Sequence, residues 1–219
     1  ITGLFSWFGS RILVFKERSI WYVDADPTQD PADWVVGLVS GNIGCVSHRS
    51  ICQVSEDVFF AADDGIYSLG EVANYSEVRT TNKSARVQRV FDALSATNKS
   101  KLVGKYHNFK YHLFYSSGGT TNDACLVYDT RYGAWQDWRN IAGNSATLFT
   151  DSSNNTDLYF GHPTTGAVYK MYVGTTDDGS AISWYWTSKS FDEDLFDIIK
   201  KYLLTTWLLS ALSGKVNLY

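Results

Sequence analysis

The stretch Phe59-Phe-Ala-Ala-Asp-Asp-Gly-Ile-Tyr-Ser-Leu69 decides the fold class of this chain. Its two apolar runs flank Asp63-Asp-Gly65, and an Asp-Gly pair between such runs is a strong short-range signal for a two-residue β-hairpin turn. The sequence therefore predicts a strand at 58–62 and its antiparallel return strand at 66–69.

The same pattern of strand, polar turn and aromatic strand recurs along the chain, in residues 12–23, 112–138 and 158–172. The copies start roughly 45–55 residues apart, which is the spacing of propeller blades. Each blade is a small twisted sheet that buries its faces against its neighbours, and aromatic side chains fill the space between blades. The repeat predicts an all-β, β-propeller-like array of short antiparallel blades.

The composition agrees with this interpretation. Aromatic residues make up 16% of the 219, which favours β-structure, where flat rings pack on pleated faces. Apolar residues are 44% and charged residues 19%, typical of a globular chain that can bury a core without metals or disulfides. The most apolar segment, Tyr202 to Leu212, is about half the ~20 residues that a spanning helix needs, so no membrane span is expected.

One segment departs from the strand pattern. Val87, Val90, Phe91 and Leu94 recur at helical spacing and predict one short helix over 84–94, with Ser84 as its cap. Arg86 and Arg89 lie off this apolar face and are expected to point to solvent or to a partner.

The remaining strands define the expected organisation. They are predicted at 11–15, 19–23, 34–39, 51–54, 102–106, 110–115, 125–129, 134–138, 147–150, 158–161, 168–173, 183–187, 201–209 and 215–219. We expect a propeller-like domain over 1–190 with about four blades. Residues 191–219 are expected to be the truncated start of a further blade or of a C-terminal β-sheet, in a fragment of a larger protein.

Several stretches resemble the β-propeller region of tailed-phage neck and tail proteins of the packaged-DNA stabilisation, tail-hub and nozzle type. They are RILVFKERSIWYV (11–23), GCVSHRSICQVSEDVFFAADDGIYSL (44–69), LVYDTRYGAWQDW (126–138), ISWYWTSKSFD (182–192) and KKYLLTTWLLSALSGKVNLY (200–219). The resemblance implies a ring of copies around a DNA channel, no catalysis, assembly in the host cytoplasm and a place in the tail or neck of the virion, such as a head–tail connector or nozzle. Family members are usually longer, in line with a fragment.

The charge is unevenly distributed. Residues 79–110 carry eight basic side chains and one acidic, between flanks of net charge −7 (1–78) and −4 (111–219). Two interpretations stay open: contact with nucleic acid or an acidic partner subunit, or a solvated helix face. The candidate contact residues are Arg79, Lys83, Arg86, Arg89, Lys99 and Lys101.

Signals for catalysis or metal binding are weak. The sequence has no Gly-x-Ser-x-Gly elbow, phosphate loop or HExxH motif. His107 and His112 lack further donors for a metal, so we predict that they are polar surface residues. The carboxylates that a propeller glycosidase could use are more simply explained as turn caps; they are Asp24, Asp57, Asp129 and Asp137. Neither a catalytic residue nor a metal or cofactor is assigned.

The tryptophans and cysteines are expected in the core. The pairs Trp135/Trp138 and Trp184/Trp186 would form sugar platforms if exposed, but Trp is costly to expose, so packing between blades is favoured. Three cysteines without metal spacing, at positions 45, 52 and 125, indicate buried thiols in a reducing compartment.

The leading hypothesis is a non-enzymatic structural component of a phage virion, a neck or tail conduit or hub subunit that acts in particle assembly and in DNA retention or passage. Its expected partners are other copies of itself in a ring, other virion proteins and, through non-specific charge contacts, DNA. The alternatives are a carbohydrate-binding or glycoside-hydrolysing β-propeller module and a cellular propeller scaffold.

Overall fold

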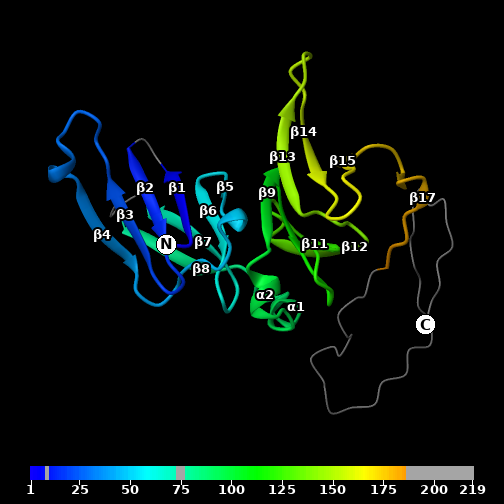
Figure 1. Cartoon of the computed structure of the whole chain (residues 1–219), viewed down its shortest axis with the longest axis horizontal. Helices are drawn as coiled ribbons and strands as arrows, with labels where there is room; N and C mark the ends of the chain where they lie inside the picture. Colours follow the sequence, from blue (N-terminus) through cyan, green and yellow to red (C-terminus); the bar gives the residue numbers. More distant parts are fainter. Residues whose placement is uncertain (8–9, 73–76, 186–219) are drawn as a thin grey trace, which may run out of the picture. The chain divides into compact units, whose positions relative to one another are not determined.

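The computed structural model describes residues 1–7, 10–72 and 77–185, and β-strands dominate this part of the chain (Figure 1). The chain divides into two compact units, Ile1–Gly174 and Thr175–Tyr219. In its described part, the first unit holds four antiparallel sheets, each built from strands consecutive in sequence. The predicted all-β array of short antiparallel blades is confirmed. The predicted C-terminal segment 191–219, with its expected strands, lies outside the described residues.

Every sheet is a simple meander. Sheet 1 pairs β1 (Gly3–Trp7), β2 (Arg11–Phe15), β3 (Ile20–Asp24) and β4 (Val35–Ser40) in that order. Sheet 2 pairs β5 (Cys52–Val54), β6 (Asp57–Ala61), β7 (Ile66–Val72) and β8 (Glu77–Asn82). Sheet 3 pairs β9 (Val103–His107), β10 (Lys110–Tyr115), β11 (Ala124–Asp129) and β12 (Ala134–Arg139). Sheet 4 pairs β13 (Ser145–Thr150), β14 (Thr156–Gly161) and β15 (Val168–Lys170). In the second unit, β16 (Thr176–Asp177) and β17 (Ser180–Ala181) form a hairpin.

The predicted repeat corresponds to the centre of each sheet. Strands β2, β6, β10 and β14 begin at Arg11, Asp57, Lys110 and Thr156, at intervals of 46, 53 and 46 residues. The longer middle interval contains the helical insertion between sheets 2 and 3. The Asp63-Asp-Gly65 turn joins β6 to β7 as predicted, with Ile66 paired to Ala61.

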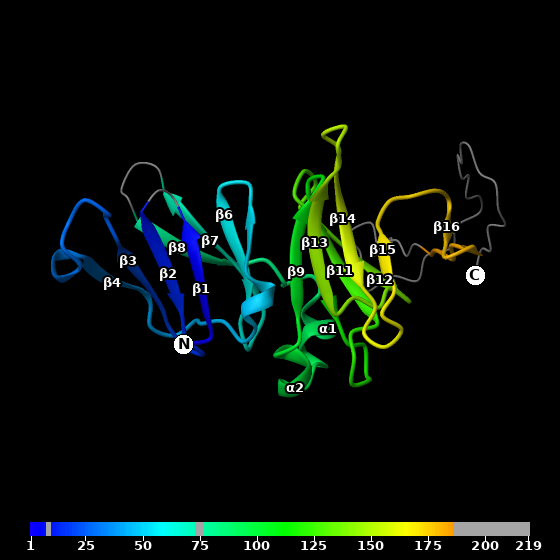
Figure 2. The ribbon, with the colours of Figure 1, turned by 45° about the horizontal axis from the view of Figure 1, so that its top comes forward.

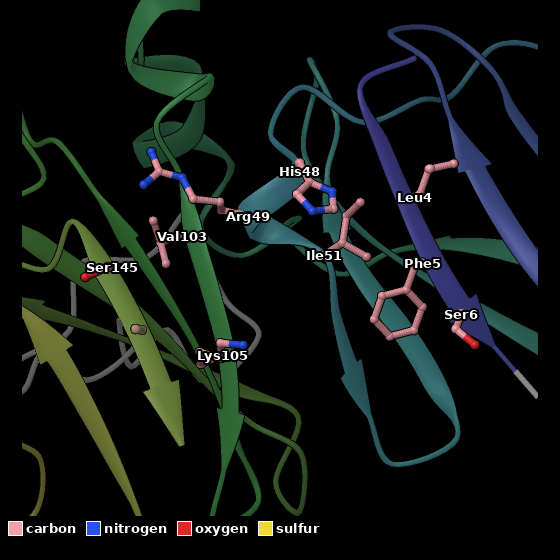
Figure 3. A pocket seen from close by; sticks show the side chains of 10 residues that line it. Leu4, Phe5, Ser6, His48, Arg49, Ile51, Val103, Lys105 and Ser145 are labelled. Carbon is pink, nitrogen blue, oxygen red and sulfur yellow. The ribbon is translucent and has the colours of Figure 1, made fainter. Parts of the chain in front are cut away.

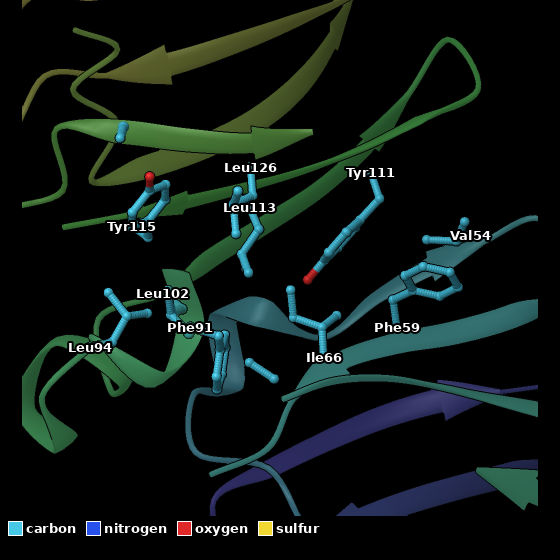
Figure 4. Close-up of a cluster of buried hydrophobic side chains, with 12 residues drawn as sticks. Val54, Phe59, Ile66, Phe91, Leu94, Leu102, Tyr111, Leu113, Tyr115 and Leu126 are labelled. Carbon is cyan, nitrogen blue, oxygen red and sulfur yellow. The ribbon is translucent and has the colours of Figure 1, made fainter. Parts of the chain in front are cut away.

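The hydrophobic core of the first unit lies between consecutive sheets, which follow one another in chain order (Figure 2). One cluster joins sheets 1 and 2 and includes Leu13, Phe15 and Phe60. A second joins sheets 2 and 3 (Figure 4), where Phe59 and Ile66 meet side chains of β10 and β11. A third joins sheets 3 and 4. The facing sides of consecutive blades thus bury one another, the arrangement that a propeller repeat requires.

The helical insertion differs from the prediction. Two short helices, α1 (Gln88–Asp92) and α2 (Ala96–Lys99), replace the single helix expected over 84–94. Their apolar face is as predicted, because Phe91 and Leu94 are buried in the cluster between sheets 2 and 3. Ser84 does not cap the helix; its buried hydroxyl instead accepts the backbone N–H of Ile66 over 3.1 Å. None of the helices in the described residues is both long and apolar enough to cross a membrane.

Some strands were not expected from sequence. Neither β1 nor β8 follows a clean alternation, and each is recruited as an edge strand by its neighbour, β2 or β7. Two short 3₁₀ turns, η1 (Pro31–Asp33) and η2 (His48–Ser50), precede β4 and β5. Residues 183–185 of the predicted strand 183–187 are not in a strand, and the rest of it lies outside the described residues.

Candidate functional site

A groove runs along the first strands of the four sheets in the first unit, and Figure 3 shows one of its two cavities. It consists of two adjoining cavities of about 400 and 460 Å³, which share Phe5 of β1, Ile51 before β5 and Lys105 of β9. Strand β13 contributes Ala146 to one cavity and Leu148 to the other. The groove is therefore a joint product of all four blades.

The charged side chains that line this groove are all cationic or potentially cationic: His48, Arg49 and Lys105. One guanidinium nitrogen of Arg49 donates to the carbonyl of Asn144 over 2.9 Å, which links η2 to the start of β13. Among the described residues, the half-buried Lys105 ammonium makes no hydrogen bond or ion pair. The described lining contains no carboxylate, so the formally charged side chains in it, Arg49 and Lys105, are both cationic.

The segment 44–51 (GCVSHRSI) holds this groove in place, because its polar groups bind across sheets. Ser47 donates its hydroxyl to the Leu102 carbonyl over 2.7 Å, and the Tyr111 hydroxyl donates to the Ser50 carbonyl over 2.9 Å. The Ser50 hydroxyl accepts the Ala61 N–H over 3.0 Å. All of these groups are buried, so each bond satisfies a group that water cannot reach. The segment acts as a spacer that sets the separation of sheets 2 and 3.

His112 corrects a prediction, because it is fully buried and not a polar surface residue. Its ring forms a mutually contacting triad with the rings of Trp138 and Tyr172, at centroid distances of 6.1 and 5.7 Å. Nε2 is 2.5 Å from the Tyr172 hydroxyl, and Nδ1 is 3.4 Å from the Lys105 carbonyl. Burial lowers the pKa of His112 to about 4. An Nδ1–H tautomer lets the phenol donate to Nε2 and satisfies both nitrogens.

Further polar groups lie on the same face of sheet 3. The register places Lys105 opposite His112 and His107 opposite Lys110, with Asp129 next in that row. The Lys110 ammonium lies 5.7 Å from the centre of the Tyr172 ring. In the described residues, no three His, Cys, Asp or Glu side chains are placed to hold a metal ion.

The predicted basic contact residues fall into two groups. Lys99 and Lys101 are engaged within the fold, where their ammonium groups donate to the carbonyls of Asp63 and Thr120. Lys83 is half-buried, with its ammonium 6.0 Å from the Phe59 ring centre.

Arg86 and Arg89 differ from these lysines, because both are exposed and have no partner among the described residues. Arg79 lies in β8, and its side chain is outside what the structure describes. Of the six candidates, Arg86 and Arg89 are the two whose described side chains are free for an intermolecular contact.

The candidate carboxylates are mostly held by neighbouring arginines. Asp24 pairs with Arg11 across the β2–β3 hairpin at 2.7 Å. Asp137 pairs with Arg139 at 2.6 Å.

The third of these carboxylates, Asp129, lies 2.9 Å from Arg131. The hydrogen bonds from Arg131 lower the pKa of Asp129 to about 2. Asp129 also accepts the Arg131 N–H, as expected of an Asp that caps a turn.

The tryptophan pairs behave differently from each other. Trp135 packs on the cluster between sheets 2 and 3, and Trp138 on the cluster between sheets 3 and 4, as predicted for blade packing. Trp184 is instead 66% exposed, and its predicted companion Trp186 lies outside the described residues.

The three thiols are free; Cys45 and Cys125 are buried, and Cys52 is half-buried beside the groove. Burial raises the pKa of Cys45 to about 11.

A second candidate surface is the outer face of sheet 1, the face that does not contact sheet 2. The strand register places two cross-strand rows on it: Leu4, Val14, Trp21 and Leu38, and Ser6, Ile12, Val23 and Val36. Seven of these eight side chains are apolar, and Leu4, Val36 and Leu38 are more than half exposed. None belongs to a core cluster of the described residues.

The corresponding outer face of sheet 4 is mixed, because Phe149, Tyr159 and Val168 lie on it beside polar and charged side chains. It carries an ion pair between Asp157 and Lys170 at 2.5 Å, with Thr147 in the same cross-strand row as Lys170. The outer face of sheet 4 therefore carries charged groups that the two rows on sheet 1 lack.

Sequence reasoning missed the groove, although it singled out the segment 44–51 and placed Lys105 in the basic block. Strand pairing and packing bring these positions together, and no local motif marks them.

Comparison of the sequence with protein-family models finds no match, and comparison with curated proteins finds no match either.

Proposed function

We propose that this chain is a non-enzymatic structural component of a phage virion, a subunit of the neck or tail that assembles with further copies of itself and with other virion proteins. In this proposal it acts in particle assembly and in DNA retention or passage. The observation that carries the proposal is the apolar outer face of sheet 1. The propeller-like repeat and the resemblance of its segments to phage neck and tail proteins supply the virion context.

The size of this face supports a role in assembly. Four strands about 4.8 Å apart, with five residues rising about 3.4 Å each, cover on the order of 300 Å². Exposed apolar patches of this size commonly mark interaction sites. Within the chain, every described interface between consecutive sheets is closed by such rows. A sheet from a neighbouring copy would bury the outer face in the same way.

Self-association provides a first test. Leu38 and Val35 are 54% and 57% exposed on the same strand, β4, but they lie on opposite faces of sheet 1. We expect Leu38→Asp to weaken association in sedimentation velocity by at least tenfold, because a carboxylate would be buried without a partner. Val35→Asp is the matched control and should associate like the wild type. A wild-type chain that stays monomeric at high concentration would contradict the assembly role.

The virion location needs its own experiment. An antibody against the chain should label the neck or tail of purified particles in electron microscopy, and the chain should co-purify with those particles in fixed stoichiometry. Labelling confined to soluble cell protein would reject the location.

The carbohydrate-binding alternative is favoured by one observation, the exposed aromatic pair Trp184 and Tyr185. A glycan array separates the two functions. Specific glycan binding that is lost in Trp184→Ala would support the alternative, whereas an array without signal would leave the assembly role as the better account.

A further inference from the structure

We propose that the groove along β1, β5, β9 and β13 binds an extended, acidic segment of a partner protein. The inference rests on the geometry and charge of the groove and does not require the proposed virion function. It goes beyond that function because it concerns a peptide-binding site with cationic side chains, although Leu4 and Ser6 of β1 line the groove and also belong to the outer face of sheet 1.

The floor of the groove suits aliphatic side chains. Phe5, Val103, Ala146 and Leu148 line it from three strands, and Ile51 lines it from the residue before β5. The two cavities, about 400 and 460 Å³, share three lining residues and so form one continuous depression. Volumes of about 300–1,000 Å³ are typical of ligand-binding clefts. The continuous shape fits a linear chain better than a compact ligand.

The charge of the groove determines the kind of segment. Lys105 emerges beside Phe5 and Leu148, and its ammonium has no hydrogen-bond or ion-pair partner among the described residues. A carboxylate stabilises a half-buried ammonium, because the charge-assisted hydrogen bond compensates for the hydration that the ammonium has lost on burial. Arg49 adds a second positive charge to the lining of the same groove. Carboxylates along the ligand would therefore meet cations along the groove.

The backbone offers a further means of recognition. Within the described strands, β1, β5, β9 and β13 are each the first strand of their sheet, with a hydrogen-bonded neighbour on one side only. Edge strands present unpaired N–H and C=O groups, and extended peptides bind by pairing with such an edge.

A nucleic acid is the less favoured occupant. Single strands bind where exposed aromatic rings stack on successive bases. The described lining has Phe5 and Tyr106 as its aromatic side chains, both half-buried, and is otherwise mainly aliphatic and polar.

Fluorescence anisotropy with the full chain tests the proposal. The probes are a labelled peptide of four Leu-Asp repeats, the same peptide with Lys for Asp, the same with Ser for Leu, and a ten-nucleotide oligothymidylate. We expect the Leu-Asp peptide to bind at least tenfold more tightly than the other three, because it alone combines aliphatic side chains with carboxylates.

Two variants locate the binding. Lys105→Glu and Arg49→Glu should each weaken binding of the Leu-Asp peptide about tenfold or more, as expected for loss of a charge-assisted contact. Arg18→Glu makes the same charge change at an exposed residue that does not line the groove, and it should bind like the wild type. Unchanged thermal melting would show that the variants fold. If Lys105→Glu unfolds, Arg49→Glu still tests the proposal, because Arg49 is exposed and its replacement should not disturb the fold.

The opposite results would overturn the proposal. Tighter binding of oligothymidylate would assign the groove to nucleic acid. Equal binding of the Leu-Lys peptide, full retention of binding in both variants, or no binding at millimolar peptide would each reject an acidic segment. The association defect of Leu38→Asp is measured separately, so failure of one proposal is distinguishable from failure of the other.

Discussion

His112 shows how a single residue can couple the packing of two blades to pH. It is fully buried between sheets 3 and 4, and both ring nitrogens face fixed polar groups, the Tyr172 hydroxyl and the Lys105 carbonyl. Its surroundings hold two lysines and a second histidine, Lys105, Lys110 and His107, with Asp129 as the carboxylate in the neighbouring row. The imidazolium is therefore disfavoured by burial first and by nearby positive charge second.

Stability should consequently fall in mild acid. The folded-state pKa of His112 is about 4 and its ordinary value is 6.5, so the unfolded chain takes up a proton first as the pH falls. The contribution of the neutral His112 to the free energy of unfolding is complete above pH 6.5 and is lost between pH 6.5 and about 4. It amounts to roughly 2–4 kcal/mol. Thermal unfolding from pH 7.5 to 4 should show this loss in the wild type and a flatter pH dependence in His112→Gln. The exposed-residue control His48→Gln should keep the wild-type slope; equal slopes in all three would refute the assignment.

At the scale of elements, β10 joins its blade to the preceding one. Residues 111–115 of this strand are buried, so both faces of β10 are covered: one packs on sheet 2 and the other on sheet 4. The Tyr111 hydroxyl adds a hydrogen bond to this packing, because it donates to the carbonyl of Ser50 beside the groove. Strand β10 therefore contributes packing and a directional bond to the same interface.

Removing that hydroxyl should weaken the interface between sheets 2 and 3. Tyr111→Phe leaves the ring in place but deprives the buried Ser50 carbonyl of its donor, which costs about 1–3 kcal/mol. Denaturant unfolding should show a lower midpoint with an unchanged slope. Tyr132→Phe removes the same atom from a residue that is 77% exposed, and its stability should stay within about 0.5 kcal/mol of the wild type. If both variants unfold alike, the bond contributes nothing measurable.

At the scale of the whole molecule, exposed cationic and anionic side chains without an ion-pair partner lie in different segments of the chain. Arg86, before α1, and Arg89, within it, are exposed and have no partner in the part of the chain that the structure describes. The loop between β3 and β4 carries the exposed carboxylates Asp30 and Asp33. Opposite charges without an ion-pair partner within the described fold are suited to contacts between copies.

Reversing the two charges should therefore impair assembly and leave folding intact. Each exposed ion pair contributes only about 0.2–1 kcal/mol, but a closed assembly repeats the contact in every copy. Arg86→Glu/Arg89→Glu should sediment as smaller species than the wild type at low salt, with the difference shrinking at high salt. Its melting temperature should be nearly unchanged. If the double variant assembles as well as the wild type at both salt concentrations, these arginines are only part of a solvated surface.

The sequence by itself determined the hairpins, the blade spacing and the apolar face of the helical insertion. These depend on neighbouring residues: the Asp-Gly turn at 64–65, the recurring strand–turn–aromatic strand pattern, and helical spacing from Val87 to Leu94. Tertiary structure alone decided three other matters. It buried His112, since the loop carrying Tyr172 closes over a strand 60 residues away. It engaged Lys99 and Lys101 with distant carbonyls. It assembled the groove from four edge strands. Burial and charge pairing depend on contacts between residues far apart in sequence, which local patterns do not encode.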